Sequence, residues 1–255
     1  METLFIGKNI IKLNEVDSTN SYANGLLKHN RLTEGTIVIS NHQTQGRGQR
    51  GNSWNSLPGC NLTFSLILYP NFLNAKTQFF LSKITALAIA DSLACLCNDD
   101  LSKQEIKVKW PNDILLNGKK IAGILIENQF QHNSLQNSVI GIGININQKH
   151  FPDQLNQATS LIIETNKFFE LSAILSSFCS FFEPWYLKLR SGNLDLISDA
   201  YLNYLYGLNN LISFLYDDKK CEGRIIGVDL NGELKIELEN GMVRNFEIKQ
   251  IKILY

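Results

Sequence analysis

The sequence lacks the features that mark secreted, metal-binding or membrane-spanning chains. Its five cysteines are an odd number without C-x-x-C spacing, which argues against a disulfide framework and a zinc site. The four histidines lie far apart and share no ligand spacing. No run of about 18 apolar residues is present, and the charged first twenty residues contain no secretory signal. We expect a cytoplasmic protein that holds no metal with protein ligands alone.

An excess of charge of either sign is also missing. The 24 Lys and Arg residues balance 24 Asp and Glu residues, and the pI is near 6.9. This balance leaves no whole-chain electrostatic footprint for nucleic acid or an anionic membrane, so we expect neither DNA nor a membrane as a partner. A chain of 255 residues with 44% hydrophobic content is long enough for one large domain, or for one large and one small domain.

The most informative stretch is KWPNDILLNGKKIAGILIE, residues 109–127. Its Asn-Gly step between two apolar runs predicts a hairpin, because both turn positions need positive φ. The Trp-Pro-Asn-Asp break interrupts the strands, since proline has no N–H to donate. Lys120 follows the turn, and Gly123 leaves space beside it, which suits an anionic ligand. Similar hairpins also occur as solvated edges, so this stretch alone does not establish a site.

A short polar run, Asp17-Ser18-Thr19-Asn20, stands between a predicted strand over residues 4–16 and a predicted helix. Residues of these types are good N-caps, and capping the helix is one interpretation of the run. Side-chain oxygens and free N–H groups at a helix N-terminus also form a polar binding site. Both interpretations place these residues at one end of a helix.

The stretch QTQGRGQRGNSW, residues 43–54, follows a predicted strand over 36–39 and contains G-x-G-x-x-G. Loop residues follow these glycines where a dinucleotide-binding turn must open a helix, so a Rossmann fold is not favoured. Arg47 and Arg50 instead suggest a mobile flap that closes over phosphate, and Trp54 offers a flat face for a base. A solvated loop is the alternative.

The remaining pattern indicates a mixed fold with a change of period near its end. Leu234, Ile236 and Leu238 alternate with charged residues, and two further Asn-Gly steps supply hairpin turns, so residues 208–255 should form a small antiparallel meander or barrel. Apolar stripes on the long predicted helices are expected to lie in the core. Further strands are predicted over 61–69 and 138–147, and helices over 76–98, 170–190 and 195–206.

Together, DSTNSYA (17–23), QTQGRGQRGNSW (43–54), KWPNDILLNGKKIAGILIE (109–127) and GIGININ (141–147) resemble the biotin protein ligase, or biotin–[carboxylase] ligase, family. The resemblance implies an α+β fold, with a mixed sheet and flanking helices in a catalytic biotin- and ATP-binding domain over 1–206. A small SH3-like β domain would follow over 207–255. Some members carry an N-terminal DNA-binding module of roughly sixty residues. Only sixteen residues precede the first motif here, so we expect an enzyme without direct repressor function.

The resemblance also implies an activity. Such an enzyme joins biotin to ATP as biotinyl-5'-AMP with release of pyrophosphate, and then transfers biotin to the acceptor lysine of a biotin carboxyl carrier protein. ATP would bring Mg²⁺ with it. Some relatives pair through their sheets, which leaves a homodimer open. The alternatives are a lipoate or octanoate ligase on the same scaffold, which the KWPND and GRGxRG motifs disfavour, and a non-catalytic biotin-sensing module.

Site roles follow from the resemblance, position by position. Lys120 and Arg47 are the expected catalytic groups. The expected biotin-binding residues are Ser18, Thr19, Asn20, Gln43, Arg47, Gly48, Gln49, Lys120 and Gly123. The expected ATP- or adenylate-binding residues are Arg47, Arg50, Trp54, Asn112, Lys120 and Asn145. Gln49 stands where some members have a second arginine, GRGRRG, which bears on how tightly the adenylate is retained.

Overall fold

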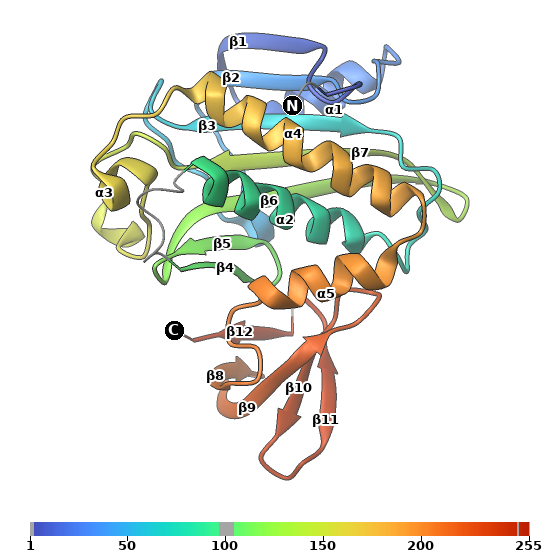
Figure 1. Ribbon diagram of the computed structural model, residues 1–255, viewed down its shortest axis with the longest axis vertical. Coiled ribbons are helices and arrows are strands. Elements are labelled where there is room, and N and C mark those ends of the chain that lie inside the picture. Colours follow the sequence, from blue (N-terminus) through green and yellow to red (C-terminus); the bar gives the residue numbers. More distant parts are fainter. Residues whose placement is uncertain (1–2, 97–104, 249, 255) are drawn as a thin grey trace.

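A seven-stranded mixed sheet forms the centre of the larger part of the molecule (Figure 1). The computed structural model describes residues 3–96, 105–248 and 250–254. The strand order is β1-β2-β3-β7-β6-β5-β4, in which β1 and β2 are parallel and all other neighbours are antiparallel. The strands are β1 (Ile10–Val16), β2 (Ile37–Gln43), β3 (Leu62–Leu68), β4 (Ile106–Lys109), β5 (Asp113–Leu116), β6 (Lys119–Gln131) and β7 (Ser134–Ile144).

Helices cover both faces of this sheet, which confirms the predicted α+β class (Figure 1). Ile37 joins the main core under the long helices, whereas Val38 joins a smaller apolar cluster under the first helix. This division follows because successive residues of a strand point to opposite faces. The helices are α1 (Thr19–Leu27), α2 (Phe79–Leu96), α3 (Leu161–Thr165), α4 (Leu171–Arg190) and α5 (Leu194–Tyr204), with 3-10 turns η1 (Gln49–Gly51) and η3 (Asp153–Leu155).

Helix α2 is the central core helix. It is long and apolar enough by composition to cross a membrane, but 72% of its apolar window is buried inside the protein, as expected of a core helix. The predicted stripe on it is confirmed, because Phe80, Ile84 and Leu87 are fully buried. The stripe on α4 also lies in the core, where Phe178 packs edge-to-face on Phe64 of β3 with ring centroids 5.2 Å apart. The predicted C-terminal end of α2, residues 97–98, lies outside the described residues.

The first part of the strand predicted over 4–16 is wrong. Residues 4–9 form turns and bends, and β1 begins only at Ile10. The reason lies on α4, where Glu183 accepts hydrogen bonds from the backbone N–H groups of Leu4, Phe5 and Ile6 at 2.6, 2.9 and 3.0 Å. A buried carboxylate satisfies these donors in place of a strand ladder.

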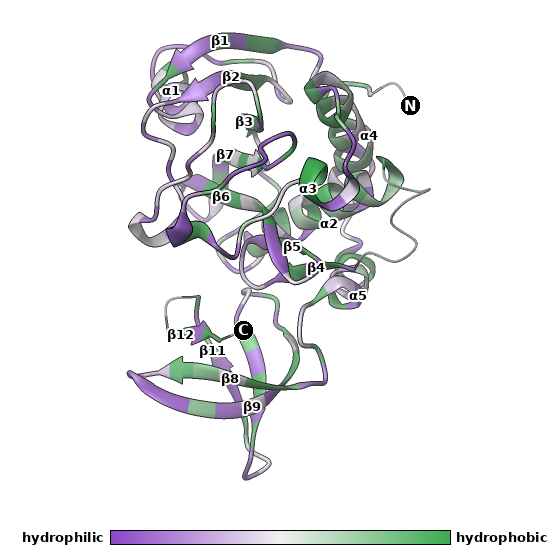
Figure 2. Cartoon of the chain, turned by 90° about the vertical axis from the view of Figure 1, so that its left-hand side faces the viewer, coloured by the Kyte–Doolittle hydropathy of each residue, from purple (hydrophilic) through white to green (hydrophobic). Residues whose placement is uncertain are grey.

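A second, five-stranded antiparallel sheet follows α5 and lies beside the edge of the larger sheet that carries β4 and β5 (Figures 1 and 2). Its order is β11-β10-β9-β8-β12, and the predicted turns at 231–232 and 240–241 connect β9 to β10 and β10 to β11. The predicted alternation on β10 is confirmed by the burial of Leu234 and Ile236. These strands are β8 (Leu211–Tyr216), β9 (Lys219–Val228), β10 (Leu234–Leu238), β11 (Val243–Phe246) and β12 (Ile251–Ile253).

One turn of the five-stranded sheet is packed against the KWPND stretch. The indole N–H of Trp110 donates to the backbone oxygen of Gly232 at 2.8 Å, and this bond is buried. Gly232 has φ +91°, and a Cβ there would lie only 2.3 Å from the ring of Phe79 on α2. Only glycine fits this turn, for reasons of both backbone conformation and space. The contact therefore connects the five-stranded sheet to the polar break between β4 and β5.

A buried lysine on α2 leads to a prediction about pH. Lys83 is 1% exposed, and its ammonium lies 3.1 Å from the hydroxyl of Ser198 and 4.5 Å from the ring centre of Phe80. Burial lowers the pKa of Lys83 to about 8, although Asp229 opposes the shift. The folded protein therefore loses this proton before the unfolded chain does. Between pH 8 and pH 10 the unfolded chain holds more protons than the folded protein does. The free energy of unfolding therefore rises with pH in this range.

We expect Lys83→Met to remove this gain. Between pH 7.5 and 10 the free energy of unfolding of the wild type should rise by about 2 kcal/mol more than that of the variant. Urea denaturation at a series of pH values measures the difference. Lys76→Met, at an exposed position just before the same helix, is the matched control and should follow the wild type. Parallel pH curves for wild type and Lys83→Met would contradict the prediction.

Candidate ligand-binding site

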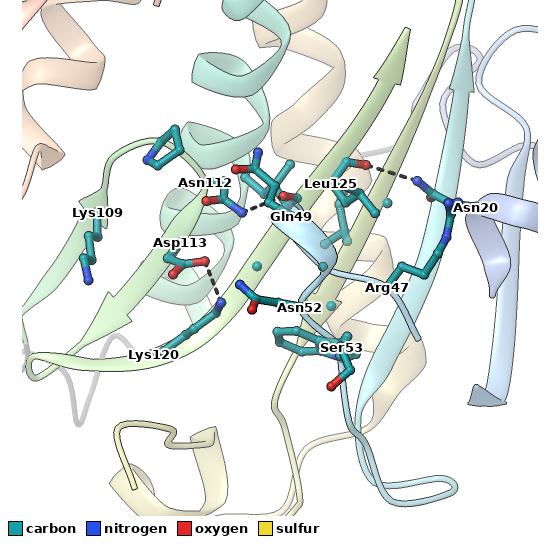
Figure 3. Close-up of a pocket in the computed structure, with 18 of the residues that line it drawn as sticks. Asn20, Arg47, Gln49, Asn52, Ser53, Lys109, Asn112, Asp113, Lys120 and Leu125 are labelled. Carbon is teal, nitrogen blue, oxygen red and sulfur yellow. Dashed lines mark hydrogen bonds and ion pairs between the residues drawn. The ribbon is translucent and has the colours of Figure 1, made fainter. Parts of the chain in front are cut away.

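A cavity of 530 Å³ lies over the α1 side of β6 and β7 and extends to the five-stranded sheet. Figure 3 shows Asn112, Asp113 and Lys120 at one side of it, and Asn20 and Arg47 at the other. The start of α1, the loop after β2, the β4–β5 break, the paired strands β6 and β7, and β12 all contribute to its lining. Two sheets and three loops thus converge on one cavity.

The side of the cavity near α1 is a connected polar network. Gln43 at the end of β2 accepts at Oε1 from the Thr19 backbone N–H at 2.8 Å and from the Thr19 hydroxyl at 3.1 Å. Ser65 of β3, fully buried, bridges to Thr19 Oγ1 at 2.8 Å and to Asn20 Oδ1 at 2.6 Å. Ser18 occupies the N-cap position without a capping side-chain hydrogen bond, so the capping interpretation is wrong for it. The network instead holds polar groups at the cavity.

The loop over residues 46–54 closes on itself above the sheet. The backbone N–H of Gly48 donates to the backbone oxygen of Asn52 at 2.7 Å, and the backbone N–H of Trp54 donates to the backbone oxygen of Gly46 at 2.8 Å. The third glycine ends a 3-10 turn, Gln49–Gly51, and no α-helix opens after it, so the loop is not a dinucleotide-binding turn. The loop is therefore compact, and it presents side chains to the cavity.

Glycines of the two central strands make room for these side chains. A Cβ on Gly143 would lie 2.3 Å from Cε2 of Trp54, and one on Gly141 would lie 2.4 Å from Oδ1 of Asn20. Gly123 lies opposite Gly143 in the β6–β7 ladder, and a Cβ on it would lie 3.1 Å from Cζ3 of Trp54. The predicted space along GIGININ is thus confirmed, and Trp54 and Asn20 occupy it.

The opposite side of the cavity is rich in cations. The Lys120 ammonium lies 2.6 Å from Oδ1 of Asp113 and 5.8 Å from the ring centre of Trp54. Lys109 precedes the WPND break, and Lys252 of β12 lines the cavity from the five-stranded sheet. Burial lowers the pKa of Lys109 to about 8; Asp113 opposes this shift, and the charges of Lys120 and Lys252 add to it. Three lysines near one carboxylate favour an anionic ligand.

The second expected catalytic cation is also paired. Arg47 Nη2 lies 2.9 Å from Oε2 of Glu127, on the part of β6 that runs past the cavity. The amides of Asn20 and Asn24 donate to the same oxygen at 2.9 and 3.0 Å. Both expected catalytic groups, Arg47 and Lys120, are therefore ion-paired with a carboxylate in this structure.

The structure gathers most of the predicted site residues around one cavity. Asn145 does not line the cavity. This residue is 3% exposed just after β7, where its side-chain amide donates to the backbone oxygen of Thr159 at 3.0 Å. The side chain of Arg50 lies outside the described part of the structure. Predicted residues in the lining are Ser18, Thr19, Asn20, Gln43, Arg47, Gly48, Gln49, Trp54, Asn112, Lys120 and Gly123.

Several residues at the site were not among the sequence predictions. Lys109 borders the WPND break and could have been found by that position, and Glu127 ends the quoted KWPND stretch. Ser65 and Lys252 carry no local signal, because each reaches the site only through the arrangement of its strand in the fold. Lys252 in particular comes from the five-stranded sheet, more than a hundred residues after the hairpin.

The fold and the cavity define an α+β ligand-binding protein whose site has a polar end beside α1, a flat indole and a lysine-rich end at the β4–β5 break. The chain matches the family model described as "Biotin/lipoate A/B protein ligase family" over residues 13–145. The chain belongs to this family.

Individual relatives agree with this assignment. The chain is 31% identical over 245 residues to the "Bifunctional ligase/repressor BirA" of Bacillus spizizenii, covering 95% of this chain and 73% of the relative. It is 30% identical to the "Biotin--[acetyl-CoA-carboxylase] ligase" of Paracoccus denitrificans, covering 87% of this chain and 91% of that protein. The structure resembles a biotin protein ligase from Aquifex aeolicus in complex with biotin and ATP. Their TM-score is 0.81 at 25% identity, and the match covers 97% of this chain and 99% of that one.

The close approach of Trp54 to Gly143 is testable. Gly143→Ala should displace the indole, because its new Cβ would overlap the ring, and acrylamide quenching of tryptophan fluorescence should increase. Adding Trp54→Phe to the variant should abolish the increase. Gly25→Ala on α1, where a Cβ meets nothing within 4 Å, is the control. Unchanged quenching in Gly143→Ala would show that the ring does not lie on this strand.

Proposed function

We propose that this protein is an ATP-dependent biotin protein ligase. In the first step a biotin carboxylate oxygen attacks the α-phosphorus of ATP, and pyrophosphate leaves; in the second the amine of an acceptor lysine attacks the biotinyl carbonyl carbon, and AMP leaves. The acceptor would be a biotin carboxyl carrier protein or carrier domain. The observation that carries the proposal is the convergence of Arg47, Lys120, Lys109 and Lys252 on a cavity with a polar far end.

Repulsion between two anionic substrates is the main barrier that these residues would lower. The first step brings a carboxylate and a polyphosphate together, and Arg47 and Lys120 would neutralise the developing negative charge. Each cation could exchange its carboxylate partner for the ligand, because that partner is only partly buried. The side-chain exposures are 32% for Glu127 and 21% for Asp113. The Thr19, Gln43 and Ser65 network would orient the neutral polar part of biotin, and Trp54 would stack on the adenine. Positioning would supply much of the rate.

Magnesium would enter with ATP and neutralise phosphate oxygens. Within the described ranges no group of three or more His, Cys, Asp or Glu side chains is placed to hold a metal alone. Asp113 is the carboxylate in the cavity lining, and one carboxylate with phosphate oxygens and water is a usual arrangement for Mg²⁺. The residues present therefore fit a metal that arrives as part of the nucleotide complex.

Three further features belong to this proposal. We assign residues 1–206 to a catalytic domain and 207–255 to a C-terminal domain that helps to complete the site through Lys252. The family resemblance would place Asn145 near the adenine; the residue is buried just outside the cavity lining, and its Oδ1 has no hydrogen-bond partner within the described parts of the chain. A lipoate or octanoate ligase on the same scaffold is the alternative function, because the matched family includes lipoate ligases.

Pyrophosphate exchange into ATP tests the first step. With purified protein and Mg²⁺, we expect exchange that depends on biotin and not on lipoate or octanoate. Exchange with lipoate or octanoate alone would assign the alternative substrate. No exchange with any of the three acids would exclude the adenylation proposal.

Lys120→Ala should lower the biotin-dependent exchange rate by about 100-fold or more, because a cation at the developing charge is lost. Circular dichroism and thermal unfolding should remain close to wild type, since Lys120 is only half-buried. Lys119→Ala, exposed on the adjacent position, is the matched control and should retain exchange. Turnover like wild type in Lys120→Ala would remove this lysine from the mechanism.

A further inference from the structure

A second cavity, of 520 Å³, lies at the β1 edge of the larger sheet, the edge away from the five-stranded sheet (Figure 1). Strands β1 and β2, the first half of α4 and the N-terminal segment before β1 all contribute to its lining. Ile39 of β2 lines it and packs against the main core under the long helices, whereas the neighbouring Val38 packs under α1. The second cavity is therefore on the opposite face of the sheet from the ligand-binding site, and the two cavities share no lining residue.

The walls of this second cavity are fixed by the fold. Glu183 of α4, 5% exposed, accepts the backbone hydrogen bonds of residues 4–6 and so holds the N-terminal segment against the helix. Gly7 then turns with φ +73°, and a Cβ there would lie only 2.9 Å from Sγ of Cys179. Its backbone N–H donates to the backbone oxygen of Gly35 at 2.8 Å. A cavity with walls held in this way is preformed, as small-molecule sites usually are, and its volume lies in their range.

The second cavity combines an apolar lining with two lysines. Lys8 and Lys12 are exposed and flank Ile10 along the chain. The described residues of the lining include no aromatic ring, no arginine and no carboxylate, and the other polar groups are neutral hydroxyls and amides. Burial raises the pKa of the Cys179 thiol to about 12, so the thiol is neutral and belongs to the apolar surface. The apolar side chains of the lining include Ile6, Ile10, Ile39, Leu171, Leu175 and Cys179.

This composition selects the class of ligand. Without an aromatic ring the cavity has no surface on which a base or other flat group could stack, unlike the first cavity with its Trp54. Without an arginine it lacks the bidentate donor that is typical of phosphate sites. Lysines with no carboxylate among the lining residues are complementary to an anion, and the apolar lining is complementary to a hydrocarbon chain. The lysines lie on the β1 side and Leu175 lies on α4, so head and chain would contact different walls.

We propose that the second cavity is a binding site for a free fatty-acid anion, with the carboxylate at Lys8 and Lys12 and the unbranched chain against Ile39, Leu175 and Cys179. This site does not depend on the proposed function, because it lies on the other face of the sheet and uses none of the same residues. Absence of biotin-dependent exchange would therefore count against the proposed function alone.

Isothermal titration calorimetry with hexanoate, octanoate and decanoate tests the apolar part of the site. Each CH₂ that is added to the chain and buried should tighten binding about fourfold. Equal affinity across the series, or no binding of decanoate, would overturn the proposal.

A filled cavity shows where the fatty acid binds. Ser176→Phe, at an exposed position of α4 that lines the second cavity, should weaken decanoate binding about tenfold or more, because the ring takes volume that the chain needs. Ala173→Phe is the matched control, since Ala173 is exposed on the same helix but does not line the cavity. Circular dichroism should show both variants folded. Decanoate binding like wild type in Ser176→Phe would place the fatty acid elsewhere and overturn the proposal.

Charge reversal tests the head group. Lys12→Glu should weaken decanoate binding about three- to tenfold, because an exposed attraction is replaced by a repulsion, and the loss should shrink in high salt. Lys28→Glu, exposed at the end of α1, makes the same change in net charge away from the cavity and should bind like wild type. Decanol, which has no charge, should bind Lys12→Glu and wild type equally. An unchanged affinity of Lys12→Glu for decanoate, or an equal loss for decanol, would overturn the proposal.

Discussion

The pairing of β6 with β7 is the constraint on which the site depends. Gly123 lies opposite Gly143 in this ladder, and Gly141 is two residues further along. Without side chains there, Trp54 and Asn20 lie directly on the strands, at distances that a Cβ would prevent. Strand β6 begins at Lys119 and carries both Lys120 and Glu127, so the same strand also positions a cation and a carboxylate. The surrounding helices and loops are arranged around this floor.

Two of the cations at the site are paired with carboxylates. Each of the two cations expected to act on the ligand has one carboxylate partner, Lys120 with Asp113 and Arg47 with Glu127. Each pair is partly exposed, so each contact is weak. A deeply buried pair would be costly to separate, and an unpaired cation would not be held in one place. Under the proposed function, partial exposure would let each cation exchange its carboxylate partner for the anionic ligand.

The two sheets are joined at the most chemically specific part of the chain. Trp110 of the WPND break donates to Gly232 in the five-stranded sheet, and Lys252 reaches the cavity from the same sheet. The five-stranded sheet thus packs against the WPND break and also contributes Lys252 to the cavity. The turn at Gly232 also lies directly against Phe79 of α2.

By itself the sequence determined the hairpins, the apolar faces of α2 and α4, the alternation on β10, and most of the residues that line the cavity. These follow from local rules: positive φ at Asn117-Gly118, helical spacing, period-two alternation and quoted motifs. Only the tertiary structure decided that Glu183 binds the N-terminal backbone, that Ser65 and Lys252 reach the cavity, and that Glu127 pairs with Arg47. Such contacts join residues about fifty to nearly two hundred positions apart, and no local pattern encodes which distant partner satisfies a given charge or donor.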